Sequence, residues 1–304
     1  MRIGIDFGGT QIKVAAVRQG EIIKSVRLET PQGRNPEAVL AGIVEAVRQL
    51  DVRPTTVGLA IPGHVDNLGM IWRLPNVPGF EGVKIAETLS QELGCDVAVE
   101  NDATTAALGE NLWGRGRGFE TFLMVTLGTG VGGGLIVNNT LVRGSHGFTG
   151  EIGHMRIDWS DGAWACGCGR TGCVEAYAGT KGLIRKYREL GGEAERIRAI
   201  AEAARRREPA ALGVFAHLGQ TLGLMVVNVQ NLLDLEAVVF SGGVSASFDL
   251  FEPVVHDTIR REAFAPPLGQ IPLLVSQLGA QAGQIGAAYL SSLRRNPESV
   301  LERV

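Results

Sequence analysis

The segment Gly150–Gly179 contains the side chains with the clearest chemical potential. Cys166, Cys168 and Cys173 lie within eight positions, and His154 precedes them. Three thiolates and one imidazole form the tetrahedral ligand set of a structural zinc site. The alternative is three buried or disulfide-bonded thiols beside an unrelated surface histidine, but the odd number of cysteines in this cluster argues against disulfides. The spacing therefore predicts Zn²⁺ bound by all four side chains.

Two glycine-rich turns have the composition of phosphate-binding hairpins. The first follows a short apolar strand that ends at Asp6, and reads Phe7-Gly8-Gly9-Thr10 before a second apolar strand begins. Backbone N–H groups in such a turn can donate to a phosphate, although an ordinary hairpin turn also needs glycine. The same arrangement returns at Leu127–Gly134, and a third glycine turn follows the strand Ala237–Phe240. This repetition predicts a duplicated fold with a nucleotide bound between its halves.

Polar or glycine residues also follow two other predicted strands. Thr56–Ile61 is followed by Pro62-Gly63, and the strand Val97–Val99 is followed by Glu100-Asn101-Asp102. Ligands of α/β proteins bind at the carboxyl ends of strands, so these residues are candidate ligand contacts. The run Gly114–Gly118 is expected to be a flexible domain junction.

The composition is that of a soluble globular protein. The chain has 304 residues, 45% of them apolar and 20% charged, and a net charge of −3. This charge gives no general attraction to nucleic acid or to an anionic membrane. Asp6 interrupts the first apolar run, so no signal peptide is expected. The longest apolar candidate, Leu222–Phe240, is interrupted by polar residues, so we expect no membrane span and a cytoplasmic location.

These motifs together resemble the ROK-type sugar kinases, which include bacterial glucokinases and belong to the actin/Hsp70/hexokinase superfamily. The resemblance runs from residue 3 to about residue 290. It is carried by the segments 6–10, 100–103, 127–134, 150–154 and 166–175. Family members often carry lysine directly after the threonine of the first turn, where this chain has Gln11, and no role is transferred to the nearby Lys13. The family's repressors carry an N-terminal helix-turn-helix domain, which we do not expect in a chain whose first hairpin begins at residue 2.

The resemblance implies an α/β, duplicated ribonuclease H-like (actin-like ATPase) fold, with two domains and the active-site cleft between them. The expected small N-terminal domain is 1–113, joined by a C-terminal helix at 291–304. The expected large domain is 114–290, with the zinc-binding insertion at 150–179.

The implied reaction is transfer of the ATP γ-phosphoryl group to a hexose, with glucose converted to glucose 6-phosphate. Asp102 matches the family's catalytic aspartate and is expected to act as general base. Its alternative role is that of an N-cap for the following helix. Mg²⁺ is expected at Asp6, through water. The expected hexose contacts are Gly63, Asn76, Asn101, Asp102, Glu151, His154 and Glu175. The expected nucleotide contacts are Asp6, Gly8, Gly9, Thr10, Gly128, Thr129, Gly130, Ser241, Gly242 and Gly243.

Two other functions stay open at this point. The first is a kinase for N-acetylmannosamine, N-acetylglucosamine or fructose, and the second is a catalytically silent sugar-sensing protein. The expected small-molecule partners are the hexose and ATP, with no nucleic acid and no membrane. The family resemblance also implies a homodimer or homotetramer.

Overall fold

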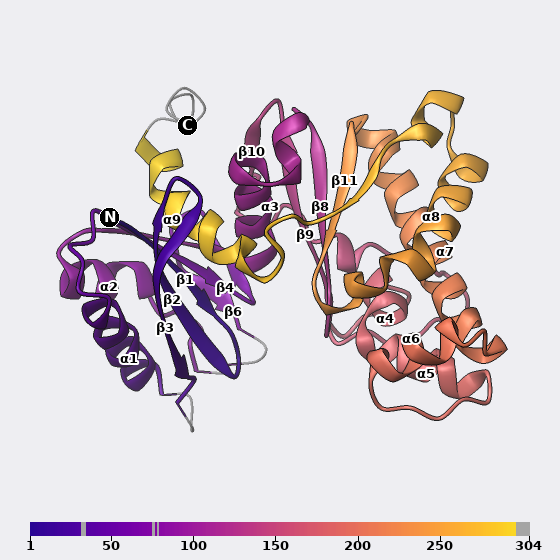
Figure 1. Ribbon diagram of the computed structural model, residues 1–304, viewed down its shortest axis with the longest axis horizontal. Coiled ribbons are helices and arrows are strands. Elements are labelled where there is room, and N and C mark those ends of the chain that lie inside the picture. Colours follow the sequence, from indigo (N-terminus) through magenta and orange to yellow (C-terminus); the bar gives the residue numbers. More distant parts are fainter. Residues whose placement is uncertain (32–34, 75–76, 78, 296–304) are drawn as a thin grey trace. The chain divides into compact units, whose positions relative to one another are not determined.

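The structure of the protein is a computed structural model that describes residues 1–31, 35–74, 77 and 79–295 (Figure 1). The chain forms two compact units. The first comprises Met1–Glu120, Gly134–Gly150 and the residues from Ser276, and the second comprises Thr121–Gly133 and Glu151–Val275. The domain boundaries 1–113 and 114–290 stay a prediction.

The first five-stranded sheet has the order β3-β2-β1-β4-β7. Strands β1 and β2 pair antiparallel, as do β2 and β3, whereas β1, β4 and β7 run parallel to one another. The parallel strands therefore end at one edge of the sheet, where ligands of α/β folds bind. The strands are β1 (Arg2–Phe7), β2 (Gln11–Arg18), β3 (Glu21–Glu29), β4 (Thr56–Ile61) and β7 (Asp96–Asn101).

The second five-stranded sheet repeats this arrangement, with the order β10-β9-β8-β11-β12. When the five strands of each sheet are numbered along the chain, both sheets have the spatial order third, second, first, fourth, fifth. Strands β8, β11 and β12 are parallel, while β9 and β10 are antiparallel. The duplication predicted from the repeated glycine turns is thus present in the strand order. The strands are β8 (Phe122–Leu127), β9 (Val131–Val137), β10 (Thr140–Val142), β11 (Ala237–Ser241) and β12 (Leu273–Val275).

The remaining elements are helices, short 3₁₀ turns and a small β5–β6 ribbon. Asn35 caps α1 by accepting a hydrogen bond from the backbone N–H of Glu37 at 2.9 Å, and Pro36 occupies the first helical position. The segment Arg115–Gly118, expected to be a flexible junction, forms a 3₁₀ turn instead. The ribbon is β5 (His64–Val65) and β6 (Ile71–Arg73). The helices are α1 (Pro36–Gln49), α2 (Ile85–Leu93), α3 (Asp102–Trp113), α4 (Val174–Ala178), α5 (Thr180–Glu189), α6 (Ile197–Arg205), α7 (Pro209–Leu233), α8 (Phe248–Glu262) and α9 (Ala282–Arg295).

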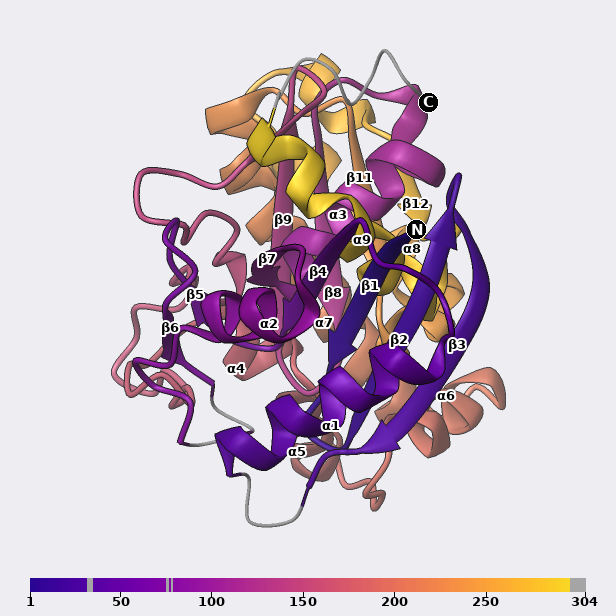
Figure 2. The same ribbon diagram turned by 90° about the vertical axis from the view of Figure 1, so that its left-hand side faces the viewer.

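Helices cover both faces of the first sheet. Ile3 and Ile5 of β1 belong to one buried cluster with Ile43 of α1, which lies across the strands in Figure 2. Alternate residues of a strand point to opposite faces, so Gly4 and the neighbouring Gly58 of β4 face the other side. There α9 approaches so closely that a Cβ on Gly4 or Gly58 would lie 1.8 Å or 1.6 Å from a carbonyl oxygen of the helix.

Helix α7 is long and apolar enough to cross a membrane by length and composition, with a mean hydropathy of 1.6. The helix begins at Pro209, well before the apolar run Leu222–Phe240, and is therefore longer than that run indicated. In the structure, 61% of the apolar 18-residue stretch of this helix is buried. Gly219 and Gly223 allow α8 to pack closely against it, as in the core helix of a soluble protein.

We predict that Gly58→Ala destabilises the first unit strongly. The added methyl would overlap the Ala287 carbonyl oxygen, a backbone atom that cannot move without shifting α9, so the cost should reach about 3 kcal/mol or more. Gly118→Ala is the matched control because no atom lies within 4 Å of the added Cβ. Thermal denaturation followed by circular dichroism compares the variants, and equal melting temperatures would contradict the close packing of α9.

Candidate functional site

The three cysteines of the second unit are brought together by a tight turn. The backbone N–H of Cys166 donates to the Arg170 carbonyl at 2.8 Å, and that of Gly169 donates to the Cys166 carbonyl at 3.0 Å. Gly169 has a φ of +89°, in the left-handed region that favours glycine. An isolated antiparallel bridge between Arg156 and Cys173 then attaches the turn to the segment that follows His154.

The four predicted zinc ligands converge. Their ligand atoms all lie within 4.8 Å of one another. Cys166 Sγ is 3.8 Å from His154 Nδ1, and Cys168 Sγ is 3.8 Å from Cys173 Sγ. A tetrahedron with Zn–S bonds of about 2.3 Å has edges of roughly 3.8 Å, so these separations fit a zinc ion. The ligand set fits the metal; the identity of the ion stays a prediction.

Burial opposes the ionisation of two of the three thiols. Burial raises the pKa of Cys166 to about 12, and burial also raises the pKa of Cys173. Burial has the same tendency at Cys168, but hydrogen bonds from Arg170 outweigh it and lower the pKa of Cys168 to about 7. A cluster of thiols therefore resists full ionisation by itself, whereas a divalent cation stabilises the thiolates by direct bonding.

The two ring nitrogens of His154 face different partners. Nδ1 faces the cysteines, whereas Nε2 lies 3.9 Å from a carboxylate oxygen of Glu151. Both residues belong to one short turn, because Glu151 immediately precedes the 3₁₀ segment Ile152–His154. The ring can therefore bind a metal through Nδ1 and present Nε2 to a polar ligand, as predicted for a residue shared by metal and sugar.

Glu175 connects the cysteine cluster to the second glycine turn, a contact that sequence reasoning missed. Its Oε1 lies 3.7 Å from Cys166 Sγ, and its Oε2 accepts a hydrogen bond from the backbone N–H of Val131 at 3.1 Å. A Cβ on Gly130 would lie 2.2 Å from Oε2, so a larger residue there would require the Glu175 carboxylate to move. On the other side of the turn, Thr180 donates its N–H and hydroxyl to the Gly128 carbonyl at 3.0 and 2.8 Å.

An aromatic cluster supports the same segment. Trp164 stacks on Tyr177 with ring centroids 4.7 Å apart, and the Tyr177 hydroxyl donates to the Asp158 carboxylate. His217 of α7 lies against both rings, and burial lowers its pKa to about 4, so the ring is neutral at pH 7. The sequence offered no signal for this cluster, because His217 is far from the others along the chain.

The third glycine turn follows β11. Gly242 has a φ of +89°, and a Cβ there would lie 2.2 Å from the Leu127 carbonyl oxygen at the end of β8. Ser241 is buried, while Gly243 begins a 3₁₀ turn with open space where a Cβ would stand. The turn is therefore held against the end of β8 in the second unit.

In the first unit, Asp6 forms an ion pair that the sequence did not assign. Lys13 is its partner across the β1–β2 ladder, and Lys13 Nζ lies 2.7 Å from Asp6 Oδ2. Thr30 holds the turn by donating its hydroxyl to the Gly8 carbonyl at 2.8 Å and its N–H to the Thr10 carbonyl at 2.9 Å. Lys13, to which no role was transferred, is thus the charged neighbour of the predicted Mg²⁺ ligand.

Asn101, and not Asp102, is the N-cap of α3. The Asn101 side-chain oxygen accepts hydrogen bonds from the N–H groups of Ala103 and Thr104 at 2.9 and 3.1 Å, and its amide donates to the Gly63 carbonyl at 3.1 Å. Asp102 is the first residue of the helix, and one of its oxygens also accepts from the Ala103 N–H at 2.8 Å. Asn101 therefore supplies the cap, and Asp102 occupies the first turn of the helix that it caps. Asn76, the remaining predicted hexose contact, lies outside the described residues.

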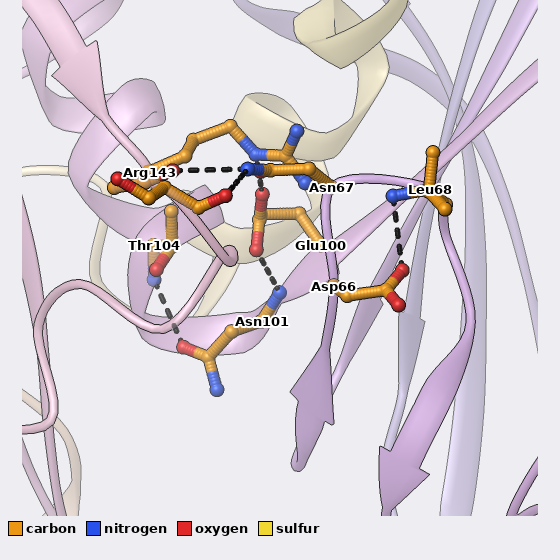
Figure 3. A network of polar contacts seen from close by, with 9 residues as sticks. Asp66, Asn67, Leu68, Glu100, Asn101, Thr104 and Arg143 are labelled. Atoms are coloured by element: carbon orange, nitrogen blue, oxygen red, sulfur yellow. Dashed lines mark hydrogen bonds and ion pairs between the residues drawn. The ribbon is translucent and has the colours of Figure 1, made fainter.

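An ion pair between a buried glutamate and a partly exposed arginine adjoins this segment and was not predicted. Glu100 is 1% exposed, pairs with Arg143 through Oε2, and accepts a hydrogen bond from the Asn101 N–H through Oε1 at 2.9 Å (Figure 3). The pairing could not be read locally because the two residues are 43 positions apart.

Comparisons with known proteins agree with the motif resemblance. The ROK family model matches residues 2–293. A glucokinase from Halalkalibacterium halodurans is 32% identical, over 97% of this chain and 96% of its own length. An N-acetyl-D-glucosamine kinase from Pasteurella multocida is 33% identical, over 95% of this chain and 99% of its own. The crystal structure of a ROK family glucokinase from Streptomyces griseus in complex with glucose and AMPPNP matches with a TM-score of 0.80 and 32% identity, covering 95% of this chain and 98% of that one. The predicted duplicated α/β fold is thereby confirmed.

We predict that purified protein contains about one zinc ion per chain and that Cys168→Ser loses most of it, since a structural site needs its complete ligand set. Cys95→Ser is the matched control, because Cys95 lies outside the cluster. Mass spectrometry of metal content measures both. Wild-type protein without stoichiometric metal would show that the zinc assignment is wrong.

Proposed function

Because the chain belongs to the ROK family, we propose that it is an ATP-dependent hexose kinase, with glucose as the favoured acceptor and glucose 6-phosphate as product. The observation that carries the proposal is the position of Asp102. It follows β7 directly, at the edge where the parallel strands of the first sheet end, and the capping of α3 is carried out by Asn101. A carboxylate at this position is suited to receive a proton from a bound hydroxyl.

In the proposed reaction, Asp102 accepts the proton of the sugar 6-hydroxyl as that oxygen attacks the γ-phosphorus of ATP. The bond between the γ-phosphorus and the β–γ bridging oxygen breaks, and ADP leaves with that oxygen. The transfer otherwise requires positioning and neutralisation of charge rather than covalent help from the protein. Asn101 contributes by holding the first turn of α3, and thereby Asp102, in place.

The glycine turns are the proposed nucleotide contacts. Their backbone N–H groups, with the hydroxyls of Thr10 and Thr129, donate to the phosphates. Asp6 would hold Mg²⁺ through water, because this ion keeps most of its hydration shell, and the ion would neutralise charge on the phosphates. Lys13, as the partner of Asp6, balances the carboxylate before the cation arrives. The complete set is Asp6, Gly8, Gly9, Thr10, Gly128, Thr129 and Gly130, with Ser241, Gly242 and Gly243 beside the nucleoside.

The proposed hexose contacts are polar groups held by their own neighbours. In the first unit they are Gly63, Asn101 and Asp102. In the second they are Glu151, His154 and Glu175. A site built from such groups rejects sugars that leave its donors and acceptors unpaired. The proposed Zn²⁺ is structural, because His154, Cys166, Cys168 and Cys173 already fill a tetrahedral shell.

A kinase for N-acetylglucosamine is the second candidate, and one observation favours it. The N-acetyl-D-glucosamine kinase of Pasteurella multocida matches this chain as extensively as the glucokinases do. N-acetylmannosamine and fructose are further acceptors to be tested. A catalytically silent sugar sensor is disfavoured by the presence of Asp102.

We also propose a cytoplasmic location, a place in glycolysis if glucose is the acceptor, and a homodimer or homotetramer. These proposals rest on the family to which the chain belongs.

The proposed function predicts ADP release that depends on both Mg·ATP and a hexose. A coupled assay over glucose, N-acetylglucosamine, N-acetylmannosamine and fructose should give the highest kcat/KM with glucose. A higher value with N-acetylglucosamine would select the second candidate. Sugar binding without turnover of any hexose would support the silent sensor instead.

We further predict that Asp102→Asn lowers kcat by ~10²-fold or more, the scale of losing a general base, while sugar affinity and melting temperature change little. The Asn101 cap is intact in this variant, so α3 should still begin at the same residue. Calorimetric titration of the sugar and steady-state kinetics provide the two readouts. Turnover within a few-fold of wild type would mean that another group takes the proton.

A further inference from the structure

The carboxylate of Glu100 has lost nearly all of its water. The residue is 1% exposed, and it is the neighbour of Asn101 and Asp102 at the end of β7. A buried carboxylate is costly unless it is paired and hydrogen-bonded. Glu100 meets both conditions, because Arg143 Nε donates to Oε2 and the Asn101 backbone N–H donates to Oε1 at 2.9 Å (Figure 3).

Arg143 is held in place from more than one side. It directly follows β10, and its side chain is 25% exposed. The amide of Asn67 donates to the carbonyls of the next two residues, Gly144 and Ser145, at 2.9 and 3.0 Å. Gly147 then packs so closely on the β5–β6 ribbon that a Cβ there would lie 2.8 Å from the Val65 carbonyl oxygen. The guanidinium is therefore presented to Glu100 by a well-anchored segment.

The pair acts on the part of the chain that carries the proposed base. Glu100 fixes the N–H of Asn101, while the Asn101 side chain caps α3 and donates to Gly63. Arg143 thus pairs with Glu100, Glu100 holds the backbone of Asn101, and Asp102 is the next residue along the chain. A displacement of about 1 Å of a reacting group can cost ~10²-fold in rate, so the position of this backbone matters.

We propose that Arg143, acting through Glu100, is a positioning residue that holds the Asn101–Asp102 segment in its reactive geometry. The inference rests on the proposed function, since it takes Asp102 as the base. Without Arg143, the buried Glu100 carboxylate loses the guanidinium that pairs with its Oε2, and it gains by turning away from Asn101 towards water. The base-bearing segment then loses the acceptor that holds its N–H.

A double-mutant cycle tests the proposal. Arg143→Met should lower the melting temperature and reduce kcat by ~10-fold or more, with the KM for Mg·ATP within about twofold of wild type. Glu100→Gln should have the smaller effect, because the glutamine oxygen can still accept from the Asn101 N–H. The double variant should recover much of the stability and of the kcat lost in Arg143→Met, because a neutral amide is less costly to bury without the guanidinium than a carboxylate.

The exposed pair Arg198–Glu202 on α6 provides the matched control. Its side chains are 90% and 53% exposed, and the same substitutions, Arg198→Met and Glu202→Gln, should leave kcat and melting temperature unchanged. Kinetics use whichever hexose the wild-type protein phosphorylates fastest.

The outcomes distinguish the proposed function from the positioning role of Arg143. A wild-type protein that phosphorylates no hexose would overturn the proposed function and, with it, the role given to Arg143. An active wild type whose Arg143→Met variant keeps its kcat would overturn the positioning role alone. A double variant no more active than Arg143→Met would also overturn it, because the loss would then not depend on the charge of Glu100.

Discussion

The first unit depends on direct contact between helix and sheet backbones. At Gly4 and Gly58 a methyl group would overlap the carbonyl oxygens of Gln284 and Ala287 of α9. The same helix meets α3 in the same way, since a Cβ on Gly286 would lie 1.7 Å from the Thr105 carbonyl oxygen. Packed interiors do not deform continuously, so contacts of this kind fix α3 relative to the sheet. The end of α3 that carries Asp102 is therefore set by residues of the last helix.

Local features of the site could be predicted from the sequence. The cysteine cluster and the first glycine turn are short segments whose residue types and spacing already determine their geometry, and the structure brings the predicted zinc ligands together. The duplication could also be predicted, because the pattern of strands and glycine turns repeats along the chain. The choice of Asn101 as the cap could not, since Asn and Asp are comparable N-caps and only the hydrogen bonds distinguish them.

Features that join distant segments could not be predicted. Lys13 meets Asp6 through the register of β1 and β2, and Arg143 meets Glu100 only once β10 and β7 are in place. The bond from the Val131 N–H to Glu175 likewise joins residues 44 positions apart. Composition and spacing identified residues able to do the chemistry, whereas tertiary structure determines which neighbour holds each of them.

The packing of α9 also sets an order for folding during synthesis. The first unit contains the N-terminal 120 residues and the residues from Ser276, whereas most of the second unit is the continuous stretch Glu151–Val275. A chain emerging from the ribosome therefore exposes the glycine-lined face of β1 and β4 until the final helix is made. N-terminal segments generally fold first during synthesis, but here the N-terminal sheet cannot complete its packing first. This face of the sheet therefore stays uncovered until α9 has been synthesised.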